Sequence, residues 1–421
     1  MNYKEINELF NETVIRNGAD EKELLREKKI EEEFKEYIES EVYPTGKVLE
    51  IYNAVGYRCF HIGFTNESLY RAHVKEEDAN LARAKFKAHF NLTEQAIDIY
   101  QVGNRLCVDI PKTESERGTL TLKGKLEQGL KIKEAKPESL PIYLGQNCDG
   151  SDLYANFDSN TFRGMLIAGQ SGMGKTSFTN SLLAYSLIIN PVSDLEVYIF
   201  DYKHNFENFK GIPGVKAVCS DIEEIRNLSI ELAELRNKRQ KVISQEGKML
   251  ELKGYNHTYP DKKLPYILVI VDEITATVIA ENKWRKDEVE RLREEGEKVR
   301  SIPPIFMDNI NELAMTARSA GFCFMVTAQE PKKNEVGRIR DELPFKMCFS
   351  TSSTSTANLV FGDNGKRATR LPGIGYALYQ LVGSDTILKL QCPFIEDGSH
   401  LKEKGDKELQ YVCNYLREHR E

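Results

Sequence analysis

The sequence predicts an α/β fold with a mostly parallel sheet in residues 151–397, and three observations support that prediction. Short apolar runs alternate with longer amphipathic stretches throughout this region, which is typical of parallel strands joined by helices. The first run, "GMLIAG", leads into the glycine-rich segment "QSGMGKTSF". A later run, "YILVIV", is followed at once by an Asp-Glu pair. Because the carboxyl ends of parallel strands lie at one edge of a sheet, we expect these polar segments to meet there.

The strands of this region are expected where apolar runs are rich in β-branched and aromatic residues. A long amphipathic helix is expected over residues 220–243, and the nearly all-charged stretch 284–300 is expected to form an exposed helical excursion. The expected strands are 164–169, 195–200, 266–271, 322–327, 345–350 and 376–381.

The rest of the chain divides into four shorter segments by composition. Residues 1–46 are dense in Glu and Lys and predict a charged helical segment. Residues 47–125 mix strand-type runs with one helical stretch, "EEDANLARAKFKAHFNL", and predict a small α+β domain. We expect residues 126–150 to be a linker with one strand, and residues 398–421 to allow a single helix.

Composition limits the function classes. The 421-residue chain has a formal net charge of −7, which argues against a protein that coats nucleic acid over its whole surface. A local basic surface remains compatible with that charge. The eight cysteines form no C-x-x-C pair and several lie in apolar runs, which favours buried thiols of a reduced cytoplasmic protein. We expect no transmembrane segment and no signal peptide, and recruitment to the inner face of the membrane is left open.

The segment after the first strand matches G-x-x-x-x-G-K-[ST] without a gap. Glycines let the backbone turn tightly and aim successive N–H groups at phosphate oxygens, and the helix that follows brings its positive end to the same point. Lys175 is expected to reach the β- and γ-phosphates of ATP, and the Thr176 hydroxyl to ligate Mg²⁺. The expected nucleotide-binding residues are Gly169, Gln170, Ser171, Gly172, Met173, Gly174, Lys175, Thr176 and Ser177.

Two further strand ends supply candidate catalytic groups. Asp272 is expected to hold Mg²⁺, and Glu273 to orient or deprotonate the attacking water. Two carboxylates that end a fully apolar strand are costly unless they face a cation or solvent. Gln329, at the end of "FCFMVTAQ", is a candidate sensor of the γ-phosphate. The sequence contains no N-K-x-D motif for guanine, which favours ATP.

Four further segments occur in this order along the chain: "FDYKHNFENFKGIPGV", "PYILVIVDEITATV", "LAMTARSAGFCFMVTAQEP" and "RIRDELPFKMCFSTSSTSTANLVFGDNGKRATRLPGIGYALYQ". Their residues and their order resemble those of the FtsK/SpoIIIE DNA translocases, which belong to a wider FtsK–HerA group that includes conjugative coupling proteins. The resemblance also covers the small domain, so it extends over about 47–395. There are departures: Tyr202 stands where the family has proline, Glu330 where it has a basic residue, and Ser355–Thr356 where it has an acidic motif.

The resemblance implies a RecA-like P-loop ATPase that assembles as a homo-oligomeric ring, usually a hexamer, around DNA. ATP then lies between neighbours, and an arginine of one subunit acts on the nucleotide of the next. Arg239 is the first candidate for that role, with Arg236 and Arg318 as alternatives. Whether the DNA is duplex or single-stranded is left open.

The resemblance also bears on the biological setting. The sequence shows no winged-helix domain after the motor and no membrane anchor, which favours transfer of plasmid or integrative-element DNA, with a relaxase or a membrane transfer channel as a partner. Two other readings are kept: a secretion-type ATPase that recruits or moves a protein, and a nucleotide-gated adaptor without enzymatic activity.

Overall fold

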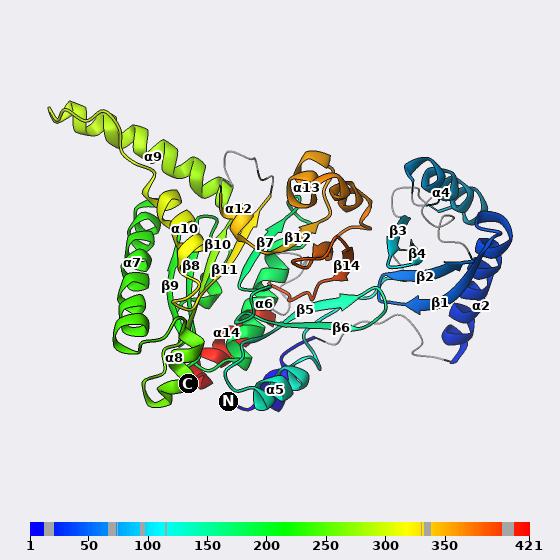
Figure 1. Cartoon of the computed structure of the whole chain (residues 1–421), viewed down its shortest axis with the longest axis horizontal. Coiled ribbons are helices and arrows are strands. Elements are labelled where there is room, and N and C mark those ends of the chain that lie inside the picture. Colours follow the sequence, from blue (N-terminus) through cyan, green and yellow to red (C-terminus); the bar gives the residue numbers. More distant parts are fainter. Residues whose placement is uncertain are drawn as a thin grey trace.

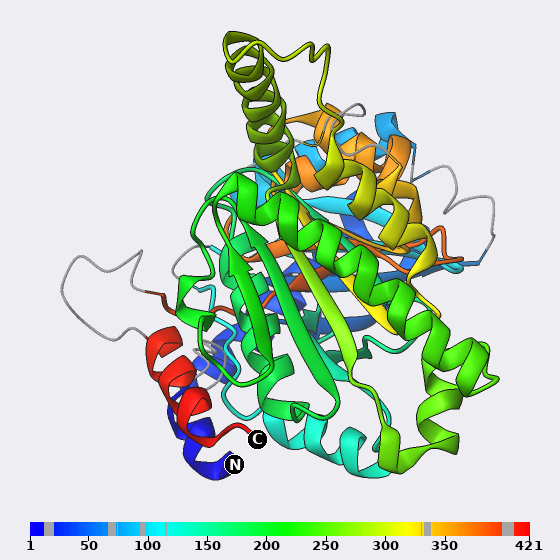
Figure 2. The same cartoon turned by 90° about the vertical axis from the view of Figure 1, so that its left-hand side faces the viewer.

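The computed structural model describes residues 1–11, 21–65, 73, 75–92, 97–113, 116–329, 331, 338–397 and 408–421. Figure 1 shows an elongated molecule in which a large sheet with helices on both faces lies beside a smaller body formed by α2, α4 and β1–β4. The two ends of the chain lie close together on the large body (Figures 1 and 2).

The large sheet has ten strands in the order β6-β5-β14-β13-β12-β7-β11-β10-β8-β9. The run from β12 to β9 is parallel, and β13, β14, β5 and β6 extend it with antiparallel pairs, so the predicted mostly parallel α/β sheet is confirmed. The strands are β5 (Pro141–Asn147), β6 (Asp152–Asn156), β7 (Gly164–Ala168), β8 (Leu195–Asp201), β9 (Val215–Cys219), β10 (Tyr266–Asp272), β11 (Phe322–Ala328), β12 (Phe345–Phe349), β13 (Tyr376–Gln380) and β14 (Ile387–Gln391).

Alternation along the central strands divides the core into two layers. In β10, Leu268 and Ile270 pack in the cluster that contains α6, whereas Ile267 and Val269 pack in the cluster that contains α7 and α10. Because side chains on both faces of such a strand are buried, its sequence is a continuous apolar run. The helices are α5 (Leu126–Ala135), α6 (Lys175–Ile189), α7 (Ile222–Lys241), α8 (Leu252–Thr258), α9 (Ile274–Glu294), α10 (Ile305–Thr316), α12 (Ile339–Glu342), α13 (Thr354–Phe361) and α14 (Glu408–His419), with the short 3₁₀ segments η3 (Glu207–Phe209), η5 (Pro260–Lys262) and η6 (Gly362–Arg370) and the π-helical turn η4 (Val242–Glu246).

The small domain has its own core. Its antiparallel sheet has the order β1-β2-β4-β3, and its helices pack through Phe34, Ile38 and Phe86 against Phe60 and Val108. The elements are α2 (Glu21–Tyr37), η1 (Ile38–Val42), β1 (Gly46–Asn53), β2 (Tyr57–Phe64), α4 (Glu76–Phe90), β3 (Asp98–Val102) and β4 (Arg105–Pro111).

A buried ion cluster joins the two bodies. Lys389 of β14 lies 2.7 Å from Asp98 Oδ2 and 2.6 Å from Asp109 Oδ2, and both carboxylates come from the small domain. Arg367 of η6 also pairs with Asp98, at 2.7 Å, and lies over the ring of Tyr100. Charges that are removed from water persist only when paired in this way, so the cluster fixes the contact between the bodies.

Two expected segment boundaries are wrong. Residues 126–150 are not a linker, because β5 pairs with β14 and β6 inside the large sheet. The segment 1–46 is divided: α1 (Tyr3–Glu8) contributes Ile6 to the core of the large body, whereas α2 packs on the small domain. Residues 398–407 lie outside the described part, and α14 packs beside α1, where Tyr415 Oη accepts from the Asn2 N–H at 3.2 Å.

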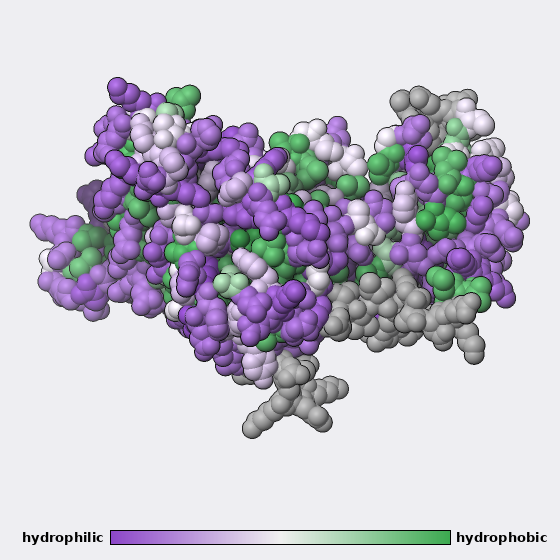
Figure 3. Space-filling model, turned by 90° about the horizontal axis from the view of Figure 1, so that it is seen from below, coloured by the Kyte–Doolittle hydropathy of each residue, from purple (hydrophilic) through white to green (hydrophobic). Residues whose placement is uncertain are grey.

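The face of the molecule in Figure 3 is mostly hydrophilic, with hydrophobic side chains in small separate groups. Among the described residues, no helix combines the length and the hydropathy that a bilayer crossing needs.

Candidate functional site

The loop between β7 and α6 has the backbone of a phosphate-binding turn. Gly169, Gly172 and Gly174 have φ values of 140°, 78° and 99°, a region that residues with a side chain rarely adopt. A Cβ on Gly169 would also lie 2.7 Å from Cβ of Phe349. The predicted loop therefore forms at the carboxyl end of β7, with Gly174 immediately before the first residue of α6.

Lys175 is held in this loop as a buried cation. Its side chain is only 7% exposed, and Nζ donates to the carbonyl oxygens of Gly169 and, at 2.9 Å, Gln170. Burial lowers the pKa of Lys175 to about 8, and Glu273 and Asp272 oppose that shift only in part. An anion placed here would favour the charged lysine, so the loop fits a phosphate group.

Asp272 ends β10 at the same edge of the sheet. Its Oδ1 accepts a hydrogen bond of 2.7 Å from the Thr327 hydroxyl, and its Oδ2 accepts one of 2.7 Å from the Asn205 side-chain amide. Asn205 is itself fixed, because its N–H donates to Asp201 Oδ1 at 2.8 Å. These contacts orient the carboxylate, as neighbouring groups orient ligands in metal sites, so the arrangement suits Mg²⁺.

Glu273 has a strained backbone, with φ 47° and ψ 63°. Its N–H donates to Thr327 Oγ1 at 2.8 Å, and its Oε1 accepts from the Gln329 N–H at 3.0 Å. Lys203 Nζ lies 3.7 Å from Oε2. Burial raises the pKa of Glu273, which moves a carboxylate toward the basicity that a general base needs.

The structure brings most of the predicted site residues together. The carboxylates of Glu273 and Asp272 raise the pKa of Lys175, and the backbone N–H of Gln329 donates to Glu273 Oε1. Ser177 differs, because its hydroxyl donates to the carbonyl of Ile395 at 3.1 Å, which leaves its backbone N–H as the group for a phosphate. Thr176 lies half-buried in the first turn of α6.

Sequence reasoning missed three residues of this network, Asp201, Lys203 and Asn205, and gave no role to Thr327 at the end of its strand. Asp201 was detectable, because it ends the apolar run of β8 as Asp272 ends that of β10, and the two residues are in register on adjacent strands. Asn205 and Lys203 follow that strand end in a loop, where side-chain direction has no sequence periodicity.

Residues 128–332 match the family model described as FtsK/SpoIIIE family. This region of the chain is an FtsK/SpoIIIE domain. The DNA translocase FtsK of Helicobacter pylori is 25% identical over 321 residues, which is 74% of this chain and 34% of that protein. The DNA translocase SpoIIIE of Bacillus subtilis is 25% identical over 308 residues, 70% of this chain and 36% of that protein. The chain thus spans about a third of the length of these relatives.

Solved structures share the fold of the FtsK/SpoIIIE domain. The pCW3 conjugation coupling protein TcpA, solved as a monomer with ATPγS, aligns with a TM-score of 0.57 and 15% identity, over 93% of this chain and 99% of that one. The cytoplasmic domain of the Thermomonospora curvata type VII secretion ATPase EccC aligns with a TM-score of 0.54 and 16% identity, over 66% of this chain and 31% of that one.

Arg239 occupies a place in the FtsK/SpoIIIE domain that does not suit the role expected for it. It is 6% exposed, and its guanidinium donates to the carbonyls of Ala320, at 2.9 Å, and Pro265. The guanidinium is therefore hydrogen bonded within its own subunit, at the amino ends of β10 and β11. Arg236 pairs with Glu312, and Arg318 is exposed and bonds Asn160.

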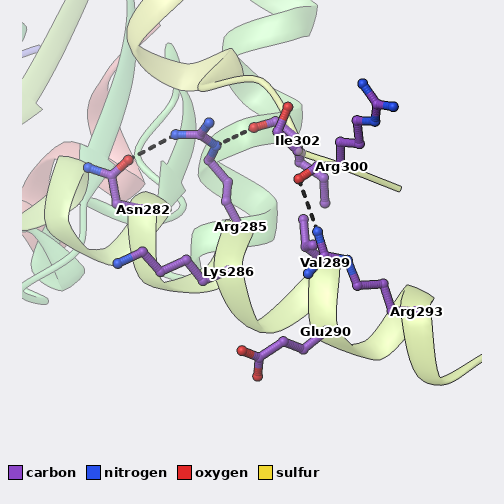
Figure 4. Close-up of a pocket in the computed structure, with 9 residues that line it drawn as sticks. Asn282, Arg285, Lys286, Val289, Glu290, Arg293, Arg300 and Ile302 are labelled. Atoms are coloured by element: carbon purple, nitrogen blue, oxygen red, sulfur yellow. Dashed lines mark hydrogen bonds between the residues drawn. The ribbon is translucent and has the colours of Figure 1, made fainter. Parts of the chain in front are cut away.

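A second feature of the FtsK/SpoIIIE domain is the charged excursion expected over residues 284–300, which is helical only as far as Glu294. The helix α9 begins directly after Glu273 and projects from the body (Figure 1). The outer half of α9 and residues 300–302, which lead back to the body, enclose a hollow of about 460 Å³. Arg285 donates to the carbonyl of Ile302 at 2.6 Å and Arg293 to the carbonyl of Arg300 at 3.3 Å, while the side chain of Arg300 extends away (Figure 4). The hollow is lined by Asn282, Arg285, Lys286, Val289, Glu290, Arg293, Arg300, Ser301 and Ile302.

The cysteines are mostly buried, as expected, but one grouping was not foreseen. Sγ of Cys59, Sγ of Cys148 and a carboxylate oxygen of Asp109 lie within 4.8 Å of one another, at the contact between the two bodies. The thiols lie beside the ion cluster of Lys389.

Proposed function

We propose that this protein is an ATPase that couples ATP hydrolysis to the translocation of DNA. The observation that carries the proposal is the convergence of a buried Lys175 in a phosphate-binding loop with Asp272 and Glu273, in a region that matches the FtsK/SpoIIIE family. A buried lysine and two buried acids around an open loop indicate phosphoryl chemistry rather than a structural ion pair.

Each residue has a distinct role in this proposal. The backbone of residues 169–177 and Lys175 hold the phosphates, while Thr176 and Asp272 hold Mg²⁺. The metal ion would supply charge neutralisation at the transferred phosphoryl group. Glu273 acts as the base for the attacking water, and Gln329 senses the γ-phosphate. Glu273 and Gln329 share a hydrogen bond, which supports a coupled response to the nucleotide.

The DNA contact is assigned to a local surface, because the whole chain has a net charge of −7. The outer half of α9 and residues 300–302 offer such a surface, since Lys286 on the helix and Arg300 after it are exposed beside the hollow. Phosphate contacts from such side chains give affinity without sequence preference. This helix also begins next to Glu273, which links the proposed DNA contact directly to the proposed base.

We further propose that the protein works as a ring, usually hexameric, in the cytoplasm, and moves plasmid or integrative-element DNA with a relaxase or a membrane channel as a partner. The full-length fold likeness to the coupling protein TcpA supports this setting. The competing proposal is a secretion-type ATPase that acts on a protein. The likeness to EccC supports it, although it covers a smaller share of the chain.

The test is the ATP turnover of the purified full chain, measured alone, with duplex DNA and with single-stranded DNA. We expect duplex or single-stranded DNA to raise the ATP turnover of the wild type, and we expect neither DNA to raise that of Glu273→Gln. Binding should also weaken with salt, and the combined change Lys286→Ala and Arg300→Ala should reduce the slope of log affinity against log salt by about 2. The matched control changes two exposed lysines elsewhere, Lys131→Ala and Lys238→Ala. Turnover that DNA does not alter would favour the secretion-type function.

A further inference from the structure

Three side chains that could ligate a metal ion meet at the contact between the small domain and the large body. Sγ of Cys59, Sγ of Cys148 and a carboxylate oxygen of Asp109 lie within 4.8 Å of one another. The sulfur and oxygen ligands of a tetrahedral zinc ion lie about 3.6–3.8 Å apart, as the usual Zn–S and Zn–O bond lengths require. The spacing of the three atoms therefore allows them to share one ion.

The backbone fixes where these groups lie. Cys59 of β2 and Asp109 of β4 are directly opposite each other in an antiparallel pair, which puts their side chains on the same face of the small sheet. Cys148 follows the last residue of β5, whose hairpin with β6 points toward the small domain (Figure 1). Two of the groups thus come from the small domain and one from the large body, so an ion bound by all three would bridge the two bodies.

The carboxylate of Asp109 carries the observation that points to a ligand. The residue is fully buried, and its Oδ2 accepts from Lys389 Nζ at 2.6 Å. Its Oδ1 is buried as well and has no hydrogen-bond partner among the described residues. A buried carboxylate oxygen without a partner is costly, and a metal ion would satisfy it. Lys389 would then hold the other oxygen, in the way that hydrogen bonds orient carboxylate ligands in metal sites.

The charges around the three groups leave room for a divalent cation. The carboxylates of Asp98 and Asp109 are balanced by the two cations of the ion cluster, so the cluster is neutral as it stands. Each thiol gives up its proton when it binds a metal ion. Exchange of two thiol protons for one divalent ion therefore leaves the net charge of this buried region unchanged. Sulfur ligands favour zinc over magnesium and calcium, which prefer oxygen.

We propose that Cys59, Cys148 and Asp109 bind a zinc ion that bridges the small domain and the FtsK/SpoIIIE domain. Three protein ligands leave the fourth tetrahedral position to water. Cys148 is half-buried whereas the other two ligands are buried, which gives the ion a path from solvent. A disulfide between the two cysteines would leave Asp109 Oδ1 without a partner, so the carboxylate favours a metal ion over a disulfide.

The experiment uses the purified full chain, freed of metal under reducing conditions and titrated with Co²⁺ and then Zn²⁺. Wild type should bind Co²⁺ with a sulfur-to-cobalt charge-transfer band, and Zn²⁺ should displace the cobalt. An ion at the proposed magnesium site cannot give this band, because the ligands assigned there, Thr176 and Asp272, are oxygens. Cys148→Ser should lose the band and weaken Zn²⁺ binding at least about 100-fold. The matched control, Cys219→Ser, changes another half-buried cysteine and should bind Zn²⁺ as wild type does.

Two further measurements separate a bound ion from a structural role of the cysteine. Zn²⁺ should raise the urea midpoint of wild type and of Cys219→Ser, because the ion binds the folded chain, and should not raise that of Cys148→Ser. A second variant, Asp109→Asn, should keep the sulfur-to-cobalt band, because both thiols remain, but should bind Zn²⁺ more weakly than wild type. Equal Zn²⁺ affinity of Asp109→Asn and wild type would overturn the role of the carboxylate.

Three outcomes would overturn the zinc site as a whole: unchanged Zn²⁺ affinity in Cys148→Ser, Co²⁺ binding to wild type without the sulfur band, or a reduced wild type that takes up no zinc. In the last case, loss of the two thiols to hydrogen peroxide would identify the pair as a redox disulfide instead. All of these measurements are made without nucleotide or DNA, so they leave the proposed ATPase function to its own test.

Discussion

The side-chain amide of Asn205 donates a hydrogen bond of 2.7 Å to Asp272 Oδ2. The same residue is anchored through its N–H to Asp201, so the ends of β8 and β10 are joined by one side chain. Asp272 therefore has one oxygen bonded to Asn205 and the other to Thr327. A carboxylate held on both oxygens keeps one orientation, which a magnesium ligand requires.

Asn205→Ala should lower ATP turnover by about 10- to 100-fold and raise the Mg²⁺ concentration needed for half-maximal rate, because Asp272 loses one orienting bond. The measurement is ATP turnover over a Mg²⁺ series. Asn208→Ala, on the same connection but without a side-chain bond to Asp272, is the control. If the Mg²⁺ dependence of Asn205→Ala matches that of wild type, the positioning role assigned to Asn205 is wrong.

Lys175→Ala and Glu273→Gln should fail in different ways. The first should weaken ATP binding, because the phosphates lose a point charge that the loop holds buried. The second should bind ATP with near wild-type affinity yet hydrolyse it at least about 100-fold more slowly, since an amide cannot accept the proton of water. Affinity by titration calorimetry and turnover are measured for both variants. Hydrolysis by Glu273→Gln at the wild-type rate would remove Glu273 as the base.

The predictable part of the site is the part encoded in consecutive residues. The phosphate loop and the Asp272–Glu273 pair follow strands of continuous apolar residues, and both were located from the sequence. Thr327 and Asn205 reach Asp272 from 55 and 67 residues away, and no local pattern reports such a contact. The sequence also does not predict the burial of Arg239, because a basic residue near a helix end is usually exposed and its partners lie far along the chain.

The fold shows the same division. The apolar runs predict the parallel strands, whereas the strand expected in 126–150 is predicted to lie in a linker outside the sheet, because its partner β14 lies far along the chain. Antiparallel pairing at the edge of a parallel sheet depends on tertiary contacts that propensity does not reveal. The division of residues 1–46 between two bodies has the same origin, because α1 packs on α14 from the opposite end of the chain.

Asp201 should make the stability of the protein depend on pH. Burial raises its pKa to about 6, above the value of an unfolded chain, so the folded state binds a proton more tightly. The stabilisation from that proton is complete below about pH 4 and is lost as the pH rises through about 6. The free energy of unfolding of wild type minus that of Asp201→Asn should therefore fall between pH 4 and 6 and then level off. Denaturant titrations of both proteins across this range test it; a difference that stays constant contradicts the shifted pKa.

Lys389→Met should destabilise the folded protein by about 3–5 kcal/mol, because two buried carboxylates, Asp98 and Asp109, lose their shared cation. Pairing with Arg367 and Lys389 holds the pKa of Asp98 below its usual value, against the effect of burial. The control is Lys366→Met, whose partner Glu76 is exposed and whose loss should cost at most about 1 kcal/mol. Urea unfolding of both variants gives the comparison, and equal losses would mean that the cluster does not hold the two bodies together.

The arginine that acts between subunits is now expected to be Arg318 rather than Arg239. Arg239→Ala should destabilise the fold by about 2 kcal/mol or more, because the carbonyls of Ala320 and Pro265 lose their donor. Arg318 is exposed just before β11, at the sheet edge opposite the phosphate loop, and in a head-to-tail ring that edge can face the nucleotide of the next subunit.

Arg318→Ala should keep its fold and its ATP affinity but lose turnover by about 10³-fold, because an arginine of this kind stabilises charge only in the transition state. Mixed with Lys175→Ala subunits, it should regain part of the activity, since some interfaces then combine an intact loop with an intact arginine. Arg236→Ala, on the same side of the domain but paired with Glu312, is the control and should keep its turnover. Mixtures that assemble together yet remain as inactive as each variant alone would show that Arg318 does not act on a neighbour's nucleotide.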